Sequence, residues 1–269
     1  MFILFKGDVM ADIDTGRHKD WEETQLQWDD TDFLAKSASA LMKKKWRRLN
    51  KKVAEIISAE VVGSTEYPDM LDIGAGRGDF YGVIQDMVRD YTGIEPSSQM
   101  LKEDVKKENY TLKRGTGEEL ADMEQYGVCL IKEVLDHTYD PEKVIKNSYN
   151  ALKEGGILIV TLTNKNAFYK LIFKKYSKEL EKAHKDHLYN FSPGEVGVLF
   201  EKAGFKKEKF YSINYIKLPV FLENIIGSLP EKFVFWMLDI SDAVMSVLLP
   251  GKGGGFIAVA RKSGGAAAL

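Results

Sequence analysis

Three glycines at alternate positions, Gly74, Gly76 and Gly78, form the clearest sign of a binding site in the sequence. They follow residues 70–73, which have the apolar character of a buried strand, and precede a helical pattern from about Asp79. In such a loop a ligand can approach backbone N–H groups and the positive end of the helix, because no Cβ stands in the way. The pattern therefore predicts a ligand-binding loop at residues 74–78.

The spacing of the glycines also disfavours one class of ligand. In the dinucleotide fingerprint the third glycine would stand at position 79, which is Asp79 in this chain. The spacing thus argues against NAD and FAD, and with them against a nicotinamide oxidoreductase.

Glu95 is the last residue of the next predicted strand. A carboxylate in this position can accept two hydrogen bonds from the vicinal hydroxyls of a ribose. The alternative is that Glu95 and Pro96 cap a helix predicted from Ser98. Next to the glycine loop, the ribose role is favoured.

Strand and helix patterns alternate along the chain, which is typical of parallel strands joined by crossover helices. Capping signals mark two of the helices: Asp140 with Pro141 before one, and the spacing of Ser192 and Glu195 before one that stops at Gly204. The first of these helices is predicted to end at residues 155–156. The strands are predicted at residues 70–73, 91–95, 110–113, 128–131, 157–162, 210–213 and 256–260.

Composition limits the class of protein. With 269 residues and 44% hydrophobic side chains, the chain can bury one large core plus appended segments. The net charge of -2 provides no overall positive potential that would attract a polyanion, so nucleic acid is not expected as a partner. Cys129 is the one cysteine, which excludes an intramolecular disulfide and favours a cytoplasmic, soluble protein. Residues 263–269 are predicted to be the remnant of an expression tag.

Four runs occur in a fixed order between about residues 65 and 165: residues 71–78, 93–97, 133–137 and 152–156. Their sequences are LDIGAGRG, GIEPS, EVLDH and LKEGG, and together they resemble the successive motifs of class I methyltransferases that depend on S-adenosylmethionine (SAM). The resemblance implies a doubly wound α/β fold with a seven-stranded, mainly parallel sheet whose last strand is reversed. It also implies SAM as the cofactor and S-adenosylhomocysteine as the co-product.

The resemblance further assigns the residues that bind the cofactor. Asp72 is expected to organise the site of the methionine amino group, the glycine loop to lie along the methionine and ribose portion, and Glu95 to hold the ribose. Thr116 stands where relatives often have an aspartate that contacts adenine, so this contact is expected from Glu118 or from backbone groups. The full predicted set is Asp72, Gly74, Ala75, Gly76, Gly78, Glu95, Pro96, Glu118 and Glu133.

Methyl transfer from a sulfonium is an in-line displacement, so the protein must align donor and nucleophile and, for a hydroxyl, remove its proton. His137 follows the fourth main strand, at the edge where open α/β folds bind ligands, and is predicted to be this base. The alternative is a histidine that only fixes the loop before Pro141. His187, which enters from an insertion, is the second predicted catalytic residue, and Asp136 could orient His137. No spacing of His, Cys and carboxylates indicates a metal site.

Two segments outside the sheet pattern bear on partners. Residues 43–52 form a basic stretch on the N-terminal helix, which could meet substrate phosphates, an anionic membrane or only solvent. Residues 218–249 are apolar but interrupted by Asp239 and Asp242, so they are too broken to span a bilayer. They could form a packed cap, a lid over a greasy acceptor, or a surface for a membrane or a second subunit.

The sequence therefore predicts an N-terminal segment and capping helix at residues 1–62, followed by a SAM-binding methyltransferase domain at residues 63–262. Helical cap insertions are expected near residues 165–190 and 214–250. The predicted reaction is methyl transfer to an oxygen, or less readily a nitrogen or carbon, of a small, apolar or aromatic acceptor by a monomer or homodimer. The rivals are a non-catalytic SAM-fold binding protein and a peripheral membrane protein.

Overall fold

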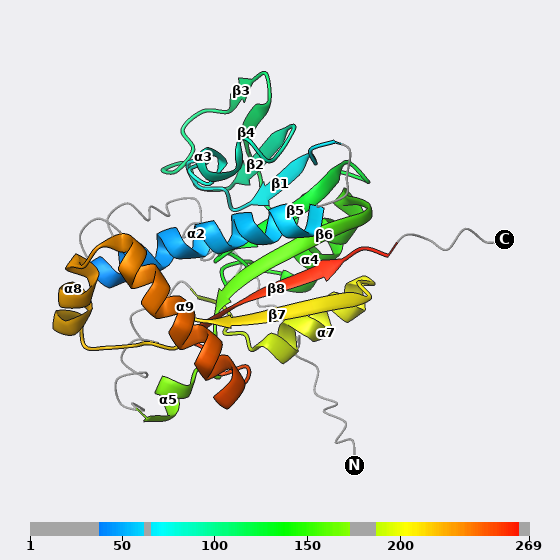
Figure 1. Ribbon diagram of the computed structural model, residues 1–269. Helices are drawn as coiled ribbons and strands as arrows, with labels where there is room; N and C mark the ends of the chain where they lie inside the picture. Colours follow the sequence, from blue (N-terminus) through cyan, green and yellow to red (C-terminus); the bar gives the residue numbers. More distant parts are fainter. Residues whose placement is uncertain (1–37, 62–65, 173–186, 264–269) are drawn as a thin grey trace, which may run out of the picture.

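A single sheet of eight strands lies at the centre of the computed structural model, which describes residues 38–61, 66–172 and 187–263 (Figure 1). The strand order is β3-β4-β2-β1-β5-β6-β8-β7. The strands are β1 Met70–Ile73, β2 Tyr91–Glu95, β3 Val105–Lys107, β4 Tyr110–Arg114, β5 Tyr126–Lys132, β6 Leu152–Thr163, β7 Lys207–Ile213 and β8 Gly255–Arg261.

The five central strands from β4 to β6 run parallel, whereas β8 is antiparallel to both β6 and β7. The predicted α/β class, the mainly parallel sheet and the reversed last strand are thus confirmed. The sheet has one strand more than the seven expected, because β3 pairs antiparallel with the outer edge of β4.

The added strand replaces a helix that was predicted from Ser98, and that prediction is wrong. Only residues 96–109 connect β2 with β4, and they form turns followed by β3. The Asp104 carboxylate accepts a hydrogen bond from the Arg114 N–H, while the Arg114 guanidinium donates to the Leu101 carbonyl. These contacts fold the segment back on β4, and the hairpin covers a sheet edge that a helix would leave unpaired. The helix expected from Asp79 is present only as the short α3, Tyr81–Ile84.

Helices cover both faces of the sheet. The helix α2, Ala40–Val61, crosses one face together with α3, while α4, Pro141–Ala151, and α7, Pro193–Ala203, cover the other (Figure 1). Two separate apolar cores result, because successive strand residues point to opposite faces. The first core joins α2 to the strands through Val53, Ile57, Met70, Val128 and Ile159.

The predicted helix caps are confirmed in detail. The Asp140 carboxylate accepts from the Lys143 N–H, and Ser192 and Glu195 form a reciprocal capping box. Gly204 ends α7 with a left-handed φ of 106°. The predicted end of α4 is wrong, however, since β6 already begins at Leu152 and includes residues 155–156.

Three helices between the strands lie in the segments where cap insertions were predicted. They are α5 Phe168–Ile172, α8 Val220–Ser228 and α9 Glu231–Leu248, and the apolar run at residues 218–249 supplies the last two. Ile213 and Gly255 are partners in the ladder between β7 and β8, so the chain leaves the sheet for α8 and α9 and returns to the same place. The expectations for residues 1–37, for residues 173–186 of the first insertion and for residues 264–269 lie outside the described residues. Among the helices that the structure describes, none combines the length and the apolar character needed to cross a bilayer.

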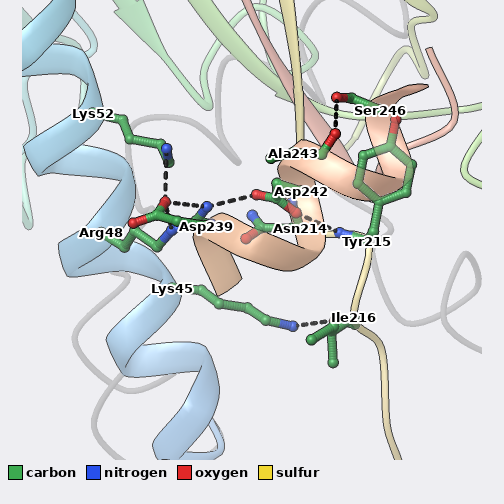
Figure 2. Close-up of polar contacts among 10 residues, drawn as sticks. All are labelled: Lys45, Arg48, Lys52, Asn214, Tyr215, Ile216, Asp239, Asp242, Ala243 and Ser246. Carbon is green, nitrogen blue, oxygen red and sulfur yellow. Dashed lines mark hydrogen bonds and ion pairs between the residues drawn. The ribbon is translucent and has the colours of Figure 1, made fainter. Parts of the chain in front are cut away.

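A buried arginine joins α2 to α9 (Figure 2). Arg48 is only 2% exposed, and one of its guanidinium nitrogens lies 2.7 Å from the Asp239 carboxylate and 2.7 Å from that of Asp242. Lys52 adds a second ion pair to Asp239 at 2.9 Å. The acidic residues that interrupt the apolar run are therefore the partners of the basic stretch on α2.

Asp242 has a further task in the same cluster. Its carboxylate accepts hydrogen bonds from the backbone N–H groups of Asn214 and Tyr215, both at 3.1 Å, where the chain leaves β7 (Figure 2). One buried carboxylate thus connects two helices with the end of a strand.

We expect Asp242→Ala to lower the free energy of unfolding by about 3 to 5 kcal/mol, because it removes a partner of a buried arginine and leaves two backbone donors unmatched. Chemical denaturation monitored by circular dichroism measures the change. The exposed Asp86 offers a matched control, and Asp86→Ala is expected to stay within about 0.5 kcal/mol of the wild type. Equal effects of the two substitutions would contradict the structural role of Asp242.

Candidate functional site

The glycine loop makes a tight turn between β1 and α3. All three glycines have positive φ angles, 74° at Gly74, 58° at Gly76 and 77° at Gly78. A Cβ on Gly74 would clash with the side chain of Val134, and one on Gly78 would clash with the hydroxyl of Tyr110. The loop therefore needs glycine both for its conformation and for the lack of space.

Glu95 lies directly against this loop. Its Oε2 accepts a hydrogen bond from the Gly76 N–H at 2.9 Å, and its Oε1 accepts one from the Ser97 N–H at 2.8 Å. The side chain is at the carboxyl end of β2 and is 7% exposed as a residue. The structure thus brings two of the predicted cofactor residues into contact. Because no helix starts at Ser98, the alternative role of Glu95 as a helix cap is excluded.

Ala75 and Pro96 flank this contact. A Cβ on Gly93 would come within 2.7 Å of the Ala75 Cβ, so the loop packs closely on β2. Pro96 directly follows Glu95 and is half-buried. Contact of either residue with the cofactor stays a prediction.

Asp72 is buried beneath the same loop. The Tyr91 hydroxyl donates a hydrogen bond of 2.7 Å to Oδ2, while Oδ1 is buried without a hydrogen-bond partner among the described residues. Burial raises the pKa of Asp72 to about 6. A buried acceptor that lacks a donor is rare and indicates that a donor is supplied by a ligand or by water.

These observations fit SAM. Glu95, held against the glycine turn, is an acceptor suited to ribose hydroxyls, and the unmatched oxygen of Asp72 suits the ammonium end of the ligand or a water bound to it.

Glu133 directly follows β5, at the carboxyl end of that strand. It has a positive φ of 54°, which is unusual for a non-glycine residue, and its Oε1 accepts a hydrogen bond of 2.9 Å from the Thr161 hydroxyl. Burial, together with the nearby charge of Asp136, raises the pKa of Glu133 to about 7. A carboxyl group with this pKa can be neutral or charged near physiological pH.

Glu118 has a different environment from the other predicted residues. Its Oε1 accepts hydrogen bonds from the N–H groups of Tyr139 at 2.9 Å and Asp140 at 3.4 Å. The side chain thus supports the loop that carries His137, and its expected contact with adenine stays a prediction.

Asp136, His137 and His187 form a compact cluster. The Asp136 Oδ2 lies 2.8 Å from His187 Nδ1, the Asp136 Oδ1 lies 4.0 Å from His137 Nε2, and the two imidazole ring centroids are 4.4 Å apart. Burial works to raise the pKa of Asp136, but the hydrogen bond from His187 and the adjacent His137 hold it below its ordinary value. The carboxylate therefore remains charged and can orient an imidazole.

Backbone contacts hold this cluster together. The N–H groups of Leu188 and Tyr189 donate to the Asp136 carbonyl at 2.9 and 3.2 Å, and the Tyr189 hydroxyl donates to the Tyr139 carbonyl. The sequence predicted His137 and His187 as separate candidates and gave Asp136 to His137. The structure instead pairs Asp136 more closely with His187, which follows it by about fifty positions.

The same cluster has the composition of a metal site. One ligand atom from each of Asp136, His137 and His187 lies within 4.8 Å of the others, and two histidines with one carboxylate are donors that zinc and iron accept. The sequence predicted no metal, since ligands from two distant segments have no recognisable spacing. The arrangement is thus suited to proton transfer or to metal binding.

Comparison with known proteins identifies the family of this chain. The sequence model of the methyltransferase domain family matches residues 34–209. This span is more than half of the chain, and the chain belongs to the methyltransferase domain family. The resemblance to class I SAM-dependent methyltransferases, with SAM as the cofactor, is confirmed at the level of the family.

A curated relative matches over part of the chain. An uncharacterized protein of Methanocaldococcus jannaschii is 28% identical over 140 residues, which is 52% of this chain. The chain spans 65% of the length of that protein, slightly less than two thirds.

Solved structures share the fold. A SAM-dependent methyltransferase from Thermotoga maritima has a TM-score of 0.53 at 20% identity, over 82% of this chain and 94% of its own. Another, from Archaeoglobus fulgidus, has a TM-score of 0.52 at 15% identity, over 79% and 94%. Phosphoethanolamine N-methyltransferase 2 of Haemonchus contortus, in complex with SAM, has a TM-score of 0.53 at 16% identity, over 79% and 53%.

The raised pKa of Glu133 makes a prediction about stability. Because its folded pKa of about 7 lies above the ordinary value of 4.5, its contribution is fully present below pH 4.5 and is lost as the pH rises to about 7. We therefore expect the wild-type melting temperature to fall between pH 5 and pH 8, and Glu133→Gln to reduce that fall. Thermal unfolding at several pH values checks this, with the exposed Glu108→Gln as the control. Parallel curves for wild type and Glu133→Gln would show that Glu133 titrates normally.

Proposed function

We propose that this chain transfers the methyl group of SAM to an oxygen atom of a small acceptor of apolar or aromatic character, and that His187 removes the acceptor's proton. The observation that carries the proposal is the 2.8 Å contact between Asp136 and His187, at the edge of the sheet that also holds the glycine loop. When bound, SAM supplies an electrophilic methyl group on a sulfonium.

The chain's own residues then have distinct tasks. Glu95 would accept hydrogen bonds from the ribose hydroxyls, and the backbone of residues 74–78 would hold the ribose and methionine portion. Asp72 would offer its unmatched oxygen to the amino end of the cofactor. These contacts fix the direction of the donor, which is the main requirement for an in-line displacement.

Proton removal favours an oxygen acceptor. A hydroxyl must lose its proton as it attacks, whereas a neutral amine attacks through a lone pair. Asp136 can hold His187 in the tautomer with a proton on Nδ1, which leaves Nε2 as the base, as in the acid-histidine pairs of hydrolases. His137 stacks its ring edge against His187 and acts as a positioning residue.

The place of Glu133 supports this assignment. It lies three residues before Asp136 in the chain, and burial together with the charge of Asp136 raises its pKa. A neutral Glu133 avoids a second negative charge beside the Asp136 carboxylate.

Binding of the cofactor can be measured without an acceptor. In calorimetric titrations with SAM, Glu95→Ala is expected to weaken binding by about 1 to 3 kcal/mol, because a charged hydrogen-bond partner of the ribose is lost. Glu95→Gln keeps one acceptor oxygen and should lose less. The exposed Glu108→Ala is the matched control, and unchanged binding by Glu95→Ala would remove Glu95 from the cofactor site.

The base can be tested through formation of S-adenosylhomocysteine with apolar phenols and matched anilines as acceptors. Phenols are expected to be the better acceptors, and a preference for anilines would assign a nitrogen acceptor instead. His187→Ala and Asp136→Asn should each lower kcat by about 10²- to 10⁴-fold while the affinity for SAM stays unchanged.

Two controls separate the alternatives for the cluster. The exposed Glu119→Gln should leave kcat unchanged. Turnover should survive a chelator of divalent metals, because His187 acts as a base. Loss of turnover with a chelator, and recovery with zinc or iron, would assign the cluster to a metal.

A further inference from the structure

The helices α8 and α9 carry large apolar side chains that point to solvent. Six of them, Phe221, Ile225, Phe233, Trp236, Ile240 and Val244, are each between 45% and 65% exposed, and they are named here the apolar face. Those of α9 recur at intervals of three or four residues, which places them on one side of the helix. The apolar face is therefore a continuous stripe along α9 and is extended by α8.

The other side of the same helices carries their acidic residues. In α9, Glu231 pairs with Arg47, Asp239 with Arg48 and Lys52, and Asp242 with Arg48. In α8, Glu223 is buried and accepts a hydrogen bond from the Ser39 hydroxyl. All four acids of the two helices thus bind groups on or just before α2, as Figure 2 shows for Asp239 and Asp242, and none interrupts the apolar face.

Positive charge borders the apolar face. The helix α2 has seven lysines and arginines and only two glutamates, so it keeps an excess of positive charge beyond Arg47, Arg48 and Lys52, which pair with the acids of α9. The ammonium group of Lys44 donates to the carbonyl of Leu229, so this basic helix reaches the junction between α8 and α9, the two helices that carry the apolar face. Lys232 on α9 is exposed, and so is Lys51 on α2, which lies 3.7 Å from Glu55 on the same helix.

From these features we propose that the apolar face, with the basic side chains beside it, docks the protein on the surface of an anionic lipid bilayer. Exposed Trp and Phe side chains suit the boundary between head groups and acyl chains, and adjacent lysines suit anionic head groups. The described helices are too short or too polar to span the bilayer, so they lie in its interface. A second copy of the chain fits less well, because a symmetric contact would bring two basic borders together.

Sedimentation of the full chain with lipid vesicles tests the proposal. The wild type is expected to sediment with vesicles of phosphatidylcholine and phosphatidylglycerol, and to bind vesicles of phosphatidylcholine alone less. The double variant Phe233→Ser with Trp236→Ser should reduce the bound fraction roughly tenfold, since each exposed aromatic loses apolar area that the bilayer would bury. Val198→Ser with Phe210→Ser, two exposed apolar residues on α7 and β7, is the matched control and should bind as the wild type does.

Charge and depth can be measured separately. Lys51→Glu with Lys232→Glu should weaken binding to the anionic vesicles and leave binding to the neutral ones unchanged. Tryptophan emission of the wild type should be quenched by brominated lipid, and Trp236→Phe should reduce that quenching while binding persists. This second measurement remains valid if the serine variant does not fold.

Some results would overturn the proposal. If the wild type stays in the supernatant with both kinds of vesicle, the apolar face does not bind lipid bilayers. If the wild type is then a dimer that Phe233→Ser with Trp236→Ser dissociates, the apolar face is a contact between subunits. Equal loss of binding in the α7 and β7 control would show that the effect is not specific to the face.

Discussion

The absence of room for side chains at Gly74 and Gly78 is the constraint on which the site depends. Val134, just after β5, occupies the space beside one glycine, and the side chain of Tyr110, the first residue of β4, occupies the space beside the other, so the turn after β1 is fixed between these two side chains. Glu95 completes this arrangement by binding the Gly76 N–H from β2. Residues on or just after three strands, β2, β4 and β5, therefore hold the loop after β1 in place.

Much of this could be predicted from the sequence because it depends on local signals. The glycine spacing, the apolar strand runs and the capping residues Asp140 and Ser192 act over a few positions. The prediction of a helix from Ser98 was wrong because part of this segment forms β3 and pairs with the open edge of β4. This pairing is a tertiary interaction that local sequence signals do not show. The approach of His187 to Asp136 could not be predicted either, since hydrogen bonds from a distant segment to the Asp136 carbonyl produce it.

The basic stretch on α2 shows a similar limit. From the sequence alone, the partner of the basic stretch could be phosphate groups, a membrane or solvent. The acids in the apolar run could be interpreted only as interruptions. In the fold the basic stretch and these acids form ion pairs with one another, for example between Arg48 and Asp242. The periodicity of apolar residues within one helix cannot predict an ion pair to another helix. In this fold such pairs fix which side of α9 faces outward.

The return of the chain to the same point of the sheet gives the cap a degree of independence. Because Ile213 and Gly255 pair with one another, α8 and α9 together amount to an enlarged connection between neighbouring antiparallel strands. Such a connection can change its length and composition without shifting the strands that anchor it. Members of one fold family can in this way differ in the exposed connection between these two strands while the sheet and its site keep the same structure.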